Sequence, residues 1–459
     1  MAYKPASFGG PLLLFGIGLK QPIAERMRPF AYNSRARSAS LCAGWFYRRE
    51  KGRLKGARRS EDAFRIAGGN PLLGLICLVI FLDSVGYGVV VPVLPIYTKN
   101  LGVSDFQVGF LFATYAIALL IAAVPMGVLS DRLGRKPFVL FGMFAMSGAF
   151  VFYAFANTYA MLVIARMLDG LTAAATWSAG LALLGDRFED SEMGEKIGYA
   201  IGAMAVGGIA GPLLGGVLSD AVGYRAPFYA IAAACLVGGF AALLLKEDRG
   251  ARRASVPAWR MLKTVLGNRM IMLACLITLI TTTGLGLLEP TLPIYLKNHF
   301  AMSRTQIGIL FGVTMFMYAA ASPVSGKLSD RIGRRDPILM GLMATAVVAP
   351  LIVAFKNVAA VYLLMGILGV TLTFLETPSI PLITDAMPKD GGEEFHYGTA
   401  FGLLNVFWSL GYALGPVVGG AITGAAGLLA ALLTYSGVLV LLAVIVMVFL
   451  KEGKRQPVK

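Results

Sequence analysis

The chain has 459 residues, of which 57% are apolar and only 14% are charged, and its mean hydropathy is +0.72. A soluble protein of this length needs far more charged side chains to cover its surface. Apolar runs of roughly 20 residues repeat from Pro71 to the C-terminus, and each is long enough to cross a bilayer core. The composition therefore excludes an ordinary soluble domain and predicts a polytopic helical membrane protein.

Basic residues are concentrated at the start of the chain. Residues 1–69 hold 14 Lys or Arg and 4 Asp or Glu, so they carry +10 of the formal net charge of +16. We interpret residues 1–70 as a disordered basic extension on the cytoplasmic side. A targeting peptide, or sequence upstream of the true start, would have the same Arg-rich and acid-poor composition. We expect no nucleic-acid partner.

Twelve membrane spans are predicted from Pro71 onward, so the fold class is an all-α polytopic membrane protein. The spans are residues 72–97, 106–129, 138–156, 159–185, 195–219, 224–246, 270–296, 304–328, 338–355, 358–386, 395–421 and 426–450. The chain divides into a basic extension (1–70), a six-helix bundle (71–246), a cytoplasmic linker (247–268), a second six-helix bundle (269–451) and a tail (452–459). Within the linker, Trp259–Leu266 predicts a short helix on the membrane surface.

Lys and Arg residues determine the predicted orientation. The extension, the loops after spans two and eight, the linker and the tail are basic and fall on one side of the membrane. The positive-inside rule makes that side cytoplasmic, with both termini inside. We expect the protein to lie in the cell membrane, in contact with lipid, as a monomer.

The chain is internally duplicated. The loop Gly127-Val-Leu-Ser-Asp-Arg-Leu-Gly-Arg-Lys-Pro137 returns as Gly326-Lys-Leu-Ser-Asp-Arg-Ile-Gly-Arg-Arg-Asp-Pro337. Further matches in register pair Pro92 with Pro290, Pro95 with Pro293, Gln107 with Gln306, Asp186 with Asp385, and Gly207 with Gly411. Two repeats of six spans imply two bundles that rock about a site near the middle of the membrane.

The repeated loop is a candidate gate. Asp131 and Arg135 lie at a span end, where together with Asp186 from the end of span four they would clamp neighbouring helices. Such a clamp holds in one state and breaks in the other, whereas the alternative is that these charges only set topology. Because Asp336 adds an acid to the second copy, we expect the first copy to be the stronger gate. The candidate gate residues are Gly127, Asp131, Arg132, Gly134, Arg135, Asp186, Gly326, Asp330, Arg331, Gly333 and Arg334.

A glycine–proline element lies in span five and returns in span eleven. Small residues let helix backbones touch, and proline kinks the helix. In span five its residues are Gly207, Gly211, Pro212, Gly215 and Gly216.

Five charged residues lie in the core of the spans, away from their ends, which makes them functional candidates because a charge there costs about 2.5–3.5 kcal/mol on insertion scales. They are Asp83, Arg166, Asp169, Glu289 and Glu376. Arg166 and Asp169, three residues apart, can pair on one helix face. Three carboxyls then remain without a cationic side chain, and burial favours their neutral form until a cation arrives. Protons and an organic cation could then compete for the same carboxyls, as antiport requires.

The combination of motifs resembles the major facilitator superfamily over about residues 71–451. The repeated loop resembles the family's motif A, and the glycine–proline element resembles motif C of its proton-driven drug antiporters. Arg166-Met-Leu-Asp-Gly170 resembles their motif B, with Asp169 where glutamine is usual. The resemblance implies alternating access driven by a proton gradient, with no bound cofactor.

Within that superfamily, Phe81-Leu-Asp83-Ser84 and Leu288-Glu289-Pro290 resemble the vesicular amine transporters. By position, the resemblance implies that Asp83 binds the substrate amine, that Glu289 lines the site, and that Glu376 couples to protons. Tyr318 and Tyr412 stand where that family has cavity tyrosines. Asn405 replaces a span-eleven aspartate and Tyr115 a span-two lysine, so neurotransmitter specificity is not supported and a broader cationic substrate is expected.

Aromatic side chains along the predicted cavity could cage a cation, although ordinary packing or lipid contact is the alternative for each. They are Tyr87, Trp177, Tyr318, Phe407, Trp408 and Tyr412. Trp177 is the leading candidate because the repeat offset places it opposite Glu376.

Other classes of function find less support. No nucleophile–base pair or phosphate loop is evident, so the chain is not expected to be an enzyme, and scattered Cys and His predict no metal site. A sugar site would favour Asn, Gln and Trp, and an anion site would need surplus Arg or Lys. A metabolite or sugar transporter therefore remains the alternative, with a transport-inactive receptor or assembly factor as a third hypothesis.

Overall fold

The computed structural model describes residues 71–188, 190–244, 267–385 and 397–450, which belong to the compact unit Asn70–Lys459. Thirteen helices make up these described residues, and twelve spans in them are long and apolar enough to cross a membrane. The predicted all-α, twelve-span fold is therefore confirmed. The basic extension, the surface helix expected at Trp259–Leu266 and the tail lie outside the described residues.

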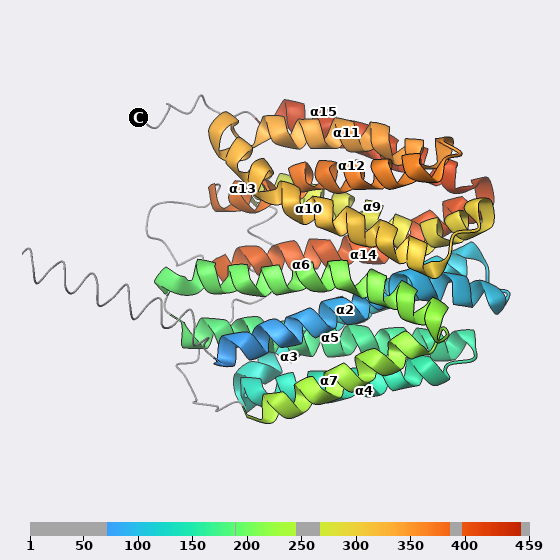
Figure 1. The fold of residues 1–459 in the computed structure, drawn as a ribbon. Coiled ribbons are helices and arrows are strands. Elements are labelled where there is room, and N and C mark those ends of the chain that lie inside the picture. Colours follow the sequence, from blue (N-terminus) through green and yellow to red (C-terminus); the bar gives the residue numbers. More distant parts are fainter. Residues whose placement is uncertain (1–70, 189, 245–266, 386–396, 451–459) are drawn as a thin grey trace, which may run out of the picture. The chain divides into compact units, whose positions relative to one another are not determined.

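Six helices make up the part of the chain that we call the first half (Figure 1). They are α2 (Pro71–Asn100), α3 (Asp105–Leu133), α4 (Arg135–Phe155), α5 (Tyr159–Arg187), α6 (Asp190–Ala221) and α7 (Ala226–Leu243). Ser104 begins α3 with a capping box, in which its hydroxyl accepts the Gln107 N–H and the Gln107 side chain accepts the Ser104 N–H. Such reciprocal capping satisfies two N–H groups that the first turn leaves free.

The second half repeats this order of helices. It contains α9 (Arg269–Phe300), α10 (Arg304–Ile332), α11 (Arg335–Ala354), α12 (Val358–Glu376), α13 (Ser379–Asp385), α14 (Tyr397–Ala426) and α15 (Leu428–Phe449). Ser303 and Gln306 form the same capping box, and Ser303 has the backbone angles of Ser104, φ −72° and ψ 163°. The duplication seen in the sequence thus extends to local backbone geometry.

Two glycines connect the helices on either side of the repeated loops. Gly134 has φ 103° and Gly333 has φ 100°, values that side-chain-bearing residues avoid. Gly134 alone separates α3 from α4, and Gly333 with Arg334 separates α10 from α11. We call this end of the bundle the loop end, and the end that carries Ser104 and Ser303 the opposite end.

The tenth span differs from its counterpart in the first half. The predicted span over 358–386 is found as the membrane span Val358–Ile383, but within it α12 ends at Glu376 and α13 begins at Ser379. Pro378 has no N–H to donate to the preceding turn, which explains the break. The counterpart α5 is continuous from Tyr159 to Arg187.

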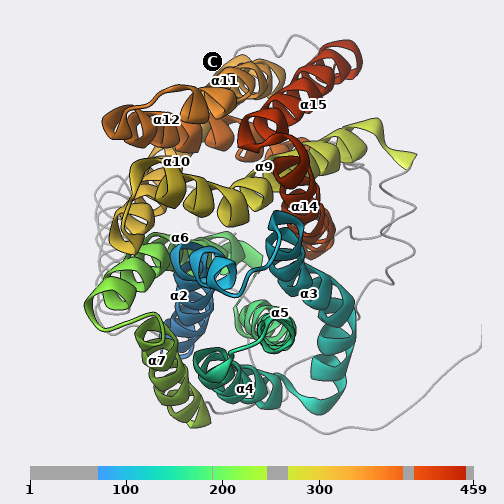
Figure 2. The same cartoon turned by 90° about the vertical axis from the view of Figure 1, so that its right-hand side faces the viewer.

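Helix packing follows the repeat (Figure 2). In the first half α2 packs on α6 and α3 on α5, and in the second half α9 packs on α14 and α10 on α12. Between the halves, α14 lies along α3 and α10 lies along α6, with a smaller contact between α2 and α9. Each half has its own apolar core.

Large apolar side chains cover the outside of the bundle. Ile121 is 69% exposed, Val237 67% and Leu363 65%. Patches of this kind are unfavourable in water but match the hydrocarbon of a bilayer. Exposure therefore agrees with the membrane-spanning assignment.

Candidate functional site

Asp83 is buried in the first half, with hydrogen bonds from α5. Trp177 Nε1 donates to Asp83 Oδ2 over 2.7 Å, and Thr176 Oγ1 donates to Asp83 Oδ1 over 3.4 Å. The carboxyl-bearing residue is only 4% exposed. Trp177 was expected opposite Glu376 but contacts Asp83, because its ring points from α5 toward α2 of the same half.

Arg166 and Asp169 form a buried ion pair on α5. Arg166 Nη1 lies 3.1 Å from Asp169 Oδ2, and their side chains are 0% and 2% exposed. The guanidinium also lies 4.9 Å from the ring centre of Tyr87 and 4.7 Å from that of Tyr115. These distances allow cation–π attraction. Tyr115, noted in the sequence as the replacement for a lysine, thus helps to hold the arginine.

Glu289 lies where the two halves meet. It belongs to α9, yet its Oε2 accepts a hydrogen bond of 2.5 Å from the hydroxyl of Tyr87 on α2. Tyr87 packs edge-on against Tyr412 of α14, and Tyr412 packs against Trp408. The result is an aromatic cluster, drawn from both halves, around one carboxyl group.

Glu376 forms a third site, within the second half. It is the last residue of α12, and its Oε2 accepts a hydrogen bond of 2.9 Å from the Tyr318 hydroxyl of α10. Asn405, predicted as part of this site, is exposed on α14. The structure therefore brings Glu376 and Tyr318 together but joins neither to Asn405.

The three carboxyls share one chemical property. Among the described residues, none of them forms an ion pair with Lys, Arg or His within 4.0 Å, since the buried cation Arg166 pairs with Asp169. Each instead accepts a hydrogen bond from a neutral hydroxyl or indole. Each of these carboxyls can therefore bind a proton or an organic cation in place of its neutral hydrogen-bond donor.

The first copy of the repeated loop forms the expected cluster. Arg135 pairs with Asp131, donates to Asp186 Oδ2 of α5 over 3.0 Å and donates to Ser130 Oγ over 2.7 Å. One guanidinium thereby joins the ends of α3, α4 and α5. This is the geometry predicted for the gate.

The second copy makes a local pair. Arg334 Nη1 lies 2.6 Å from Asp330 Oδ1 and donates to Ser329 Oγ over 3.0 Å. Asp330 is 68% exposed, whereas Asp131 is 24% exposed. The side chain of Asp385, the repeat counterpart of Asp186, lies outside the described residues.

The glycine–proline element sets how closely helices approach. A Cβ on Gly207, Gly211 or Gly215 would collide with the α2 backbone, and one on Gly216 would collide with the Arg304 backbone across the halves. Gly109 and Gly308 meet the carbonyls of Pro416 and Pro212 in the same way. The contacts of Gly216, Gly109 and Gly308, which cross between the halves, close the halves against each other at the opposite end.

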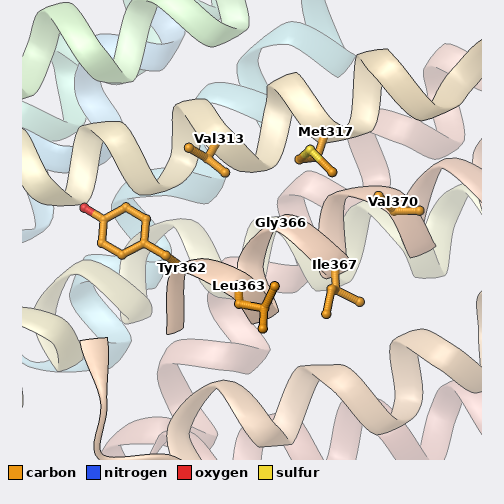
Figure 3. A pocket seen from close by; sticks show the side chains of 7 residues that line it. All are labelled: Val313, Met317, Tyr362, Leu363, Gly366, Ile367 and Val370. Carbon is orange, nitrogen blue, oxygen red and sulfur yellow. The ribbon is translucent and has the colours of Figure 1, made fainter. Parts of the chain in front are cut away.

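A separate pocket of about 450 Å³ lies between α10 and α12 (Figure 3). It is lined by Val313, Met317, Tyr362, Leu363, Gly366, Ile367 and Val370. Leu363 and Ile367 are exposed, so the pocket opens on the outer face. None of these lining residues is Asp, Glu, Lys, Arg or His, so the pocket is not the site of the buried carboxyls.

Two contacts escaped sequence reasoning. Tyr87 was noted only as a cavity aromatic, and its bond to Glu289 spans 202 residues. Thr176 was not noted at all, although its position beside Trp177 on a span facing Asp83 was an available signal.

A bundle of two helical repeats, with a buried carboxyl in each half and a third at their junction, is typical of secondary transporters. The profile described as Major Facilitator Superfamily matches residues 76–283 and 274–459. The chain therefore belongs to the Major Facilitator Superfamily, as its motifs predicted.

Sequence relatives agree. The chain is 29% identical to the synaptic vesicular amine transporter of Homo sapiens, over 72% of this chain and 64% of that protein. It is 28% identical to the probable vesicular acetylcholine transporter-B of Danio rerio, over 80% of this chain and 76% of that protein. The match thus spans about 64% of the length of the amine transporter. Family and relatives are transporters, which supports the predicted non-enzymatic role.

Solved structures share the fold. A bacterial homolog of the human lysosomal transporter Spinster, in an inward-facing and unoccupied conformation, aligns with a TM-score of 0.71 at 15% identity, over 84% of this chain and 98% of that one. Nucleoside transporter NupG aligns with a TM-score of 0.69 at 13% identity, over 83% of this chain and 100% of that one.

Proposed function

We propose that the protein is a secondary transporter that exports hydrophobic, cationic small molecules in exchange for protons. The observation that carries the proposal is the set of three buried carboxyls, Asp83, Glu289 and Glu376, which accept hydrogen bonds only from neutral donors among the described residues. A cation or a proton can satisfy each of them. Similarity to vesicular amine transporters supports an amine as the cation.

The roles divide among the three positions. Asp83 and Glu289 bind the ammonium group, with Trp177, Tyr87 and Tyr412 supplying aromatic faces beside it. Glu376, bonded to Tyr318 within the second half, takes up and releases the coupled proton. Arg166 stays paired with Asp169, which offsets the charge of this buried guanidinium and makes it less available to an anionic substrate.

Orientation follows from charge. The loop end carries the repeated basic loops, so it faces the cytoplasm of the cell membrane. Because glycine contacts close the opposite end, the described conformation receives substrate from the cytoplasmic side. The transporter acts as a monomer driven by the proton gradient, without a cofactor.

A thermal-shift screen of the purified protein tests this function. Cations, anions and sugars are compared at about pH 6 and about pH 8.5, with a hydrophobic quaternary ammonium included because its own charge does not change with pH. Protons occupy the carboxyls at low pH, so the cation should stabilise the protein more at high pH. At about 100 times its Kd, a ligand adds about 2.7 kcal/mol.

The controls separate the alternatives. Asp83→Asn should abolish the cation-induced shift in melting temperature while leaving the ligand-free protein folded. Stabilisation by a sugar or an anion, with no response to cations, would instead favour the metabolite transporter. An equal cation effect at both pH values would contradict competition with protons.

A further inference from the structure

One of the three carboxyl hydrogen bonds crosses between the halves. Tyr87 belongs to α2 and Glu289 to α9, whereas Asp83 bonds to α5 of its own half and Glu376 to α10 of its own half. We propose that Tyr87 is a positioning residue that holds the empty transporter closed at the opposite end by binding ionised Glu289. The proposal rests on the proton-antiport function above.

Packing prevents this bond from breaking by a simple side-chain rotation. The Tyr87 ring lies 5.0 Å from the ring of Tyr115 and 6.0 Å from that of Tyr412, which come from α3 and α14. The Arg166 guanidinium lies 4.9 Å from the centre of the Tyr87 ring. With the ring held by three neighbours, separation of the Tyr87 hydroxyl from Glu289 requires the two halves to move apart.

The halves also interlock beside the bond. Val91, one turn beyond Tyr87 on α2, is 3% exposed and packs in the core of the second half. Ile294 of α9 packs in turn against the core of the first half. The bond therefore lies at a closed junction, and opening that junction exposes Val91.

Strength of the bond depends on the charge of Glu289. The groups that face this carboxyl are Tyr87 of α2, Arg166 of α5 and Tyr412 of α14. A hydroxyl bonds more strongly to a carboxylate than to a neutral carboxyl. Protonation of Glu289, or its pairing with a substrate ammonium, therefore weakens the bond, and an empty ionised site strengthens it.

This dependence has the sign that exchange requires. In an antiporter, the empty carrier, which holds neither proton nor substrate, must stay in one orientation. If the empty carrier reoriented, protons or substrate could cross the membrane alone, without exchange. The cross-half bond is strongest in that empty, ionised state. Tyr87 thus makes reorientation conditional on a proton or a cation at Glu289.

The first test needs no substrate. In a background whose native cysteines are replaced by alanine, Val91→Cys is exposed to a water-soluble thiol reagent at about pH 8, where the low proton concentration favours the ionised form of Glu289. Adding Tyr87→Phe should accelerate labelling about tenfold, because the phenyl ring keeps the packing and loses the donor. Tyr362→Phe is the control: it removes a tyrosine hydroxyl bond to the Gln306 carbonyl, between α12 and α10 of one half and away from the carboxyls, and should leave the labelling rate unchanged. Equal labelling with and without Tyr87→Phe would overturn the proposal.

The second test measures coupling in proteoliposomes. Exchange of a labelled primary amine against unlabelled amine is compared with its net downhill flux, at equal pH on both sides and with a proton ionophore present. Wild-type exchange should exceed net flux about tenfold, and Tyr87→Phe should bring the two rates within about twofold of each other. Tyr362→Phe should keep the wild-type ratio. An unchanged ratio of exchange to net flux in Tyr87→Phe contradicts the role proposed for Tyr87. Absence of amine exchange in the wild-type protein contradicts the proposed function itself. In that case the labelling experiment alone tests the role of Tyr87.

Discussion

The two halves of the bundle share a sequence pattern but differ in chemistry. At the loop end, Arg135 of the first half pairs with Asp131, which is 24% exposed, whereas Arg334 of the second half pairs with Asp330, which is 68% exposed. The first half keeps its carboxyl on α2, whereas the second keeps one at the end of the broken helix α12. Duplication thus preserved the scaffold, while the polar groups that respond to protons and substrate diverged.

The largest expected difference between the halves concerns the carboxyls. Asp83→Asn should reduce amine exchange by about a hundredfold, because a neutral amide leaves the substrate ammonium without a buried counter-charge. Glu376→Gln should retain amine exchange but lose accumulation driven by a pH gradient, because it cannot release a proton. Both are measured in proteoliposomes with a labelled amine. Accumulation by Glu376→Gln at the wild-type level would remove the proposed division of roles.

A second prediction tests a region where the halves should be alike. Gly109→Ala and Gly308→Ala each place a methyl group against a backbone carbonyl of the other half, Pro416 or Pro212. Overpacking of this kind costs about 1–3 kcal/mol, so labelling of Val91→Cys should accelerate about tenfold in both variants. Gly148→Ala is the control, since a Cβ there has no neighbour within 4 Å. A response confined to one glycine would show that only one of the two contacts keeps the end closed.

The smallest expected difference compares the two loops. Asp131→Asn removes a half-buried partner of Arg135 and should slow amine exchange about tenfold, since hydrogen bonds to charged groups contribute about 1.5–3 kcal/mol. Asp330→Asn removes an exposed partner and should slow it about twofold at most. Exchange rates of the purified variants, reconstituted at equal density, decide the order. Equal losses would refute the ranking of the two gates.

Sequence reasoning recovered what depends on local pattern and repeat. The twelve spans, the repeat that pairs Gln107 with Gln306, and the cluster of Asp131, Arg135 and Asp186 all follow from motifs whose spacing can be read directly. The number of buried carboxyls without a basic partner also follows from counting. Each depends on short-range geometry or on composition.

Contacts between distant helices could not be obtained in this way. Trp177 bonds to Asp83 and Tyr87 to Glu289 because of how α5 meets α2 and how α2 meets α9. Repeat offsets align positions between halves but do not say which aligned positions touch. The break after Glu376 was readable, since Thr377-Pro378 interrupts the span and proline cannot continue the backbone hydrogen bonds.

That break gives Glu376 an electrostatic setting that its repeat counterpart lacks. The peptide dipoles of a helix sum to about half a negative charge at its C-terminus, and α12 ends at Glu376 itself. In the first half the corresponding residue, Trp177, lies inside the continuous helix α5. A cation that approaches the second half is therefore attracted by the Glu376 carboxylate and by the C-terminus of α12 at the same place. The repeat counterpart α5 has no helix terminus at this position.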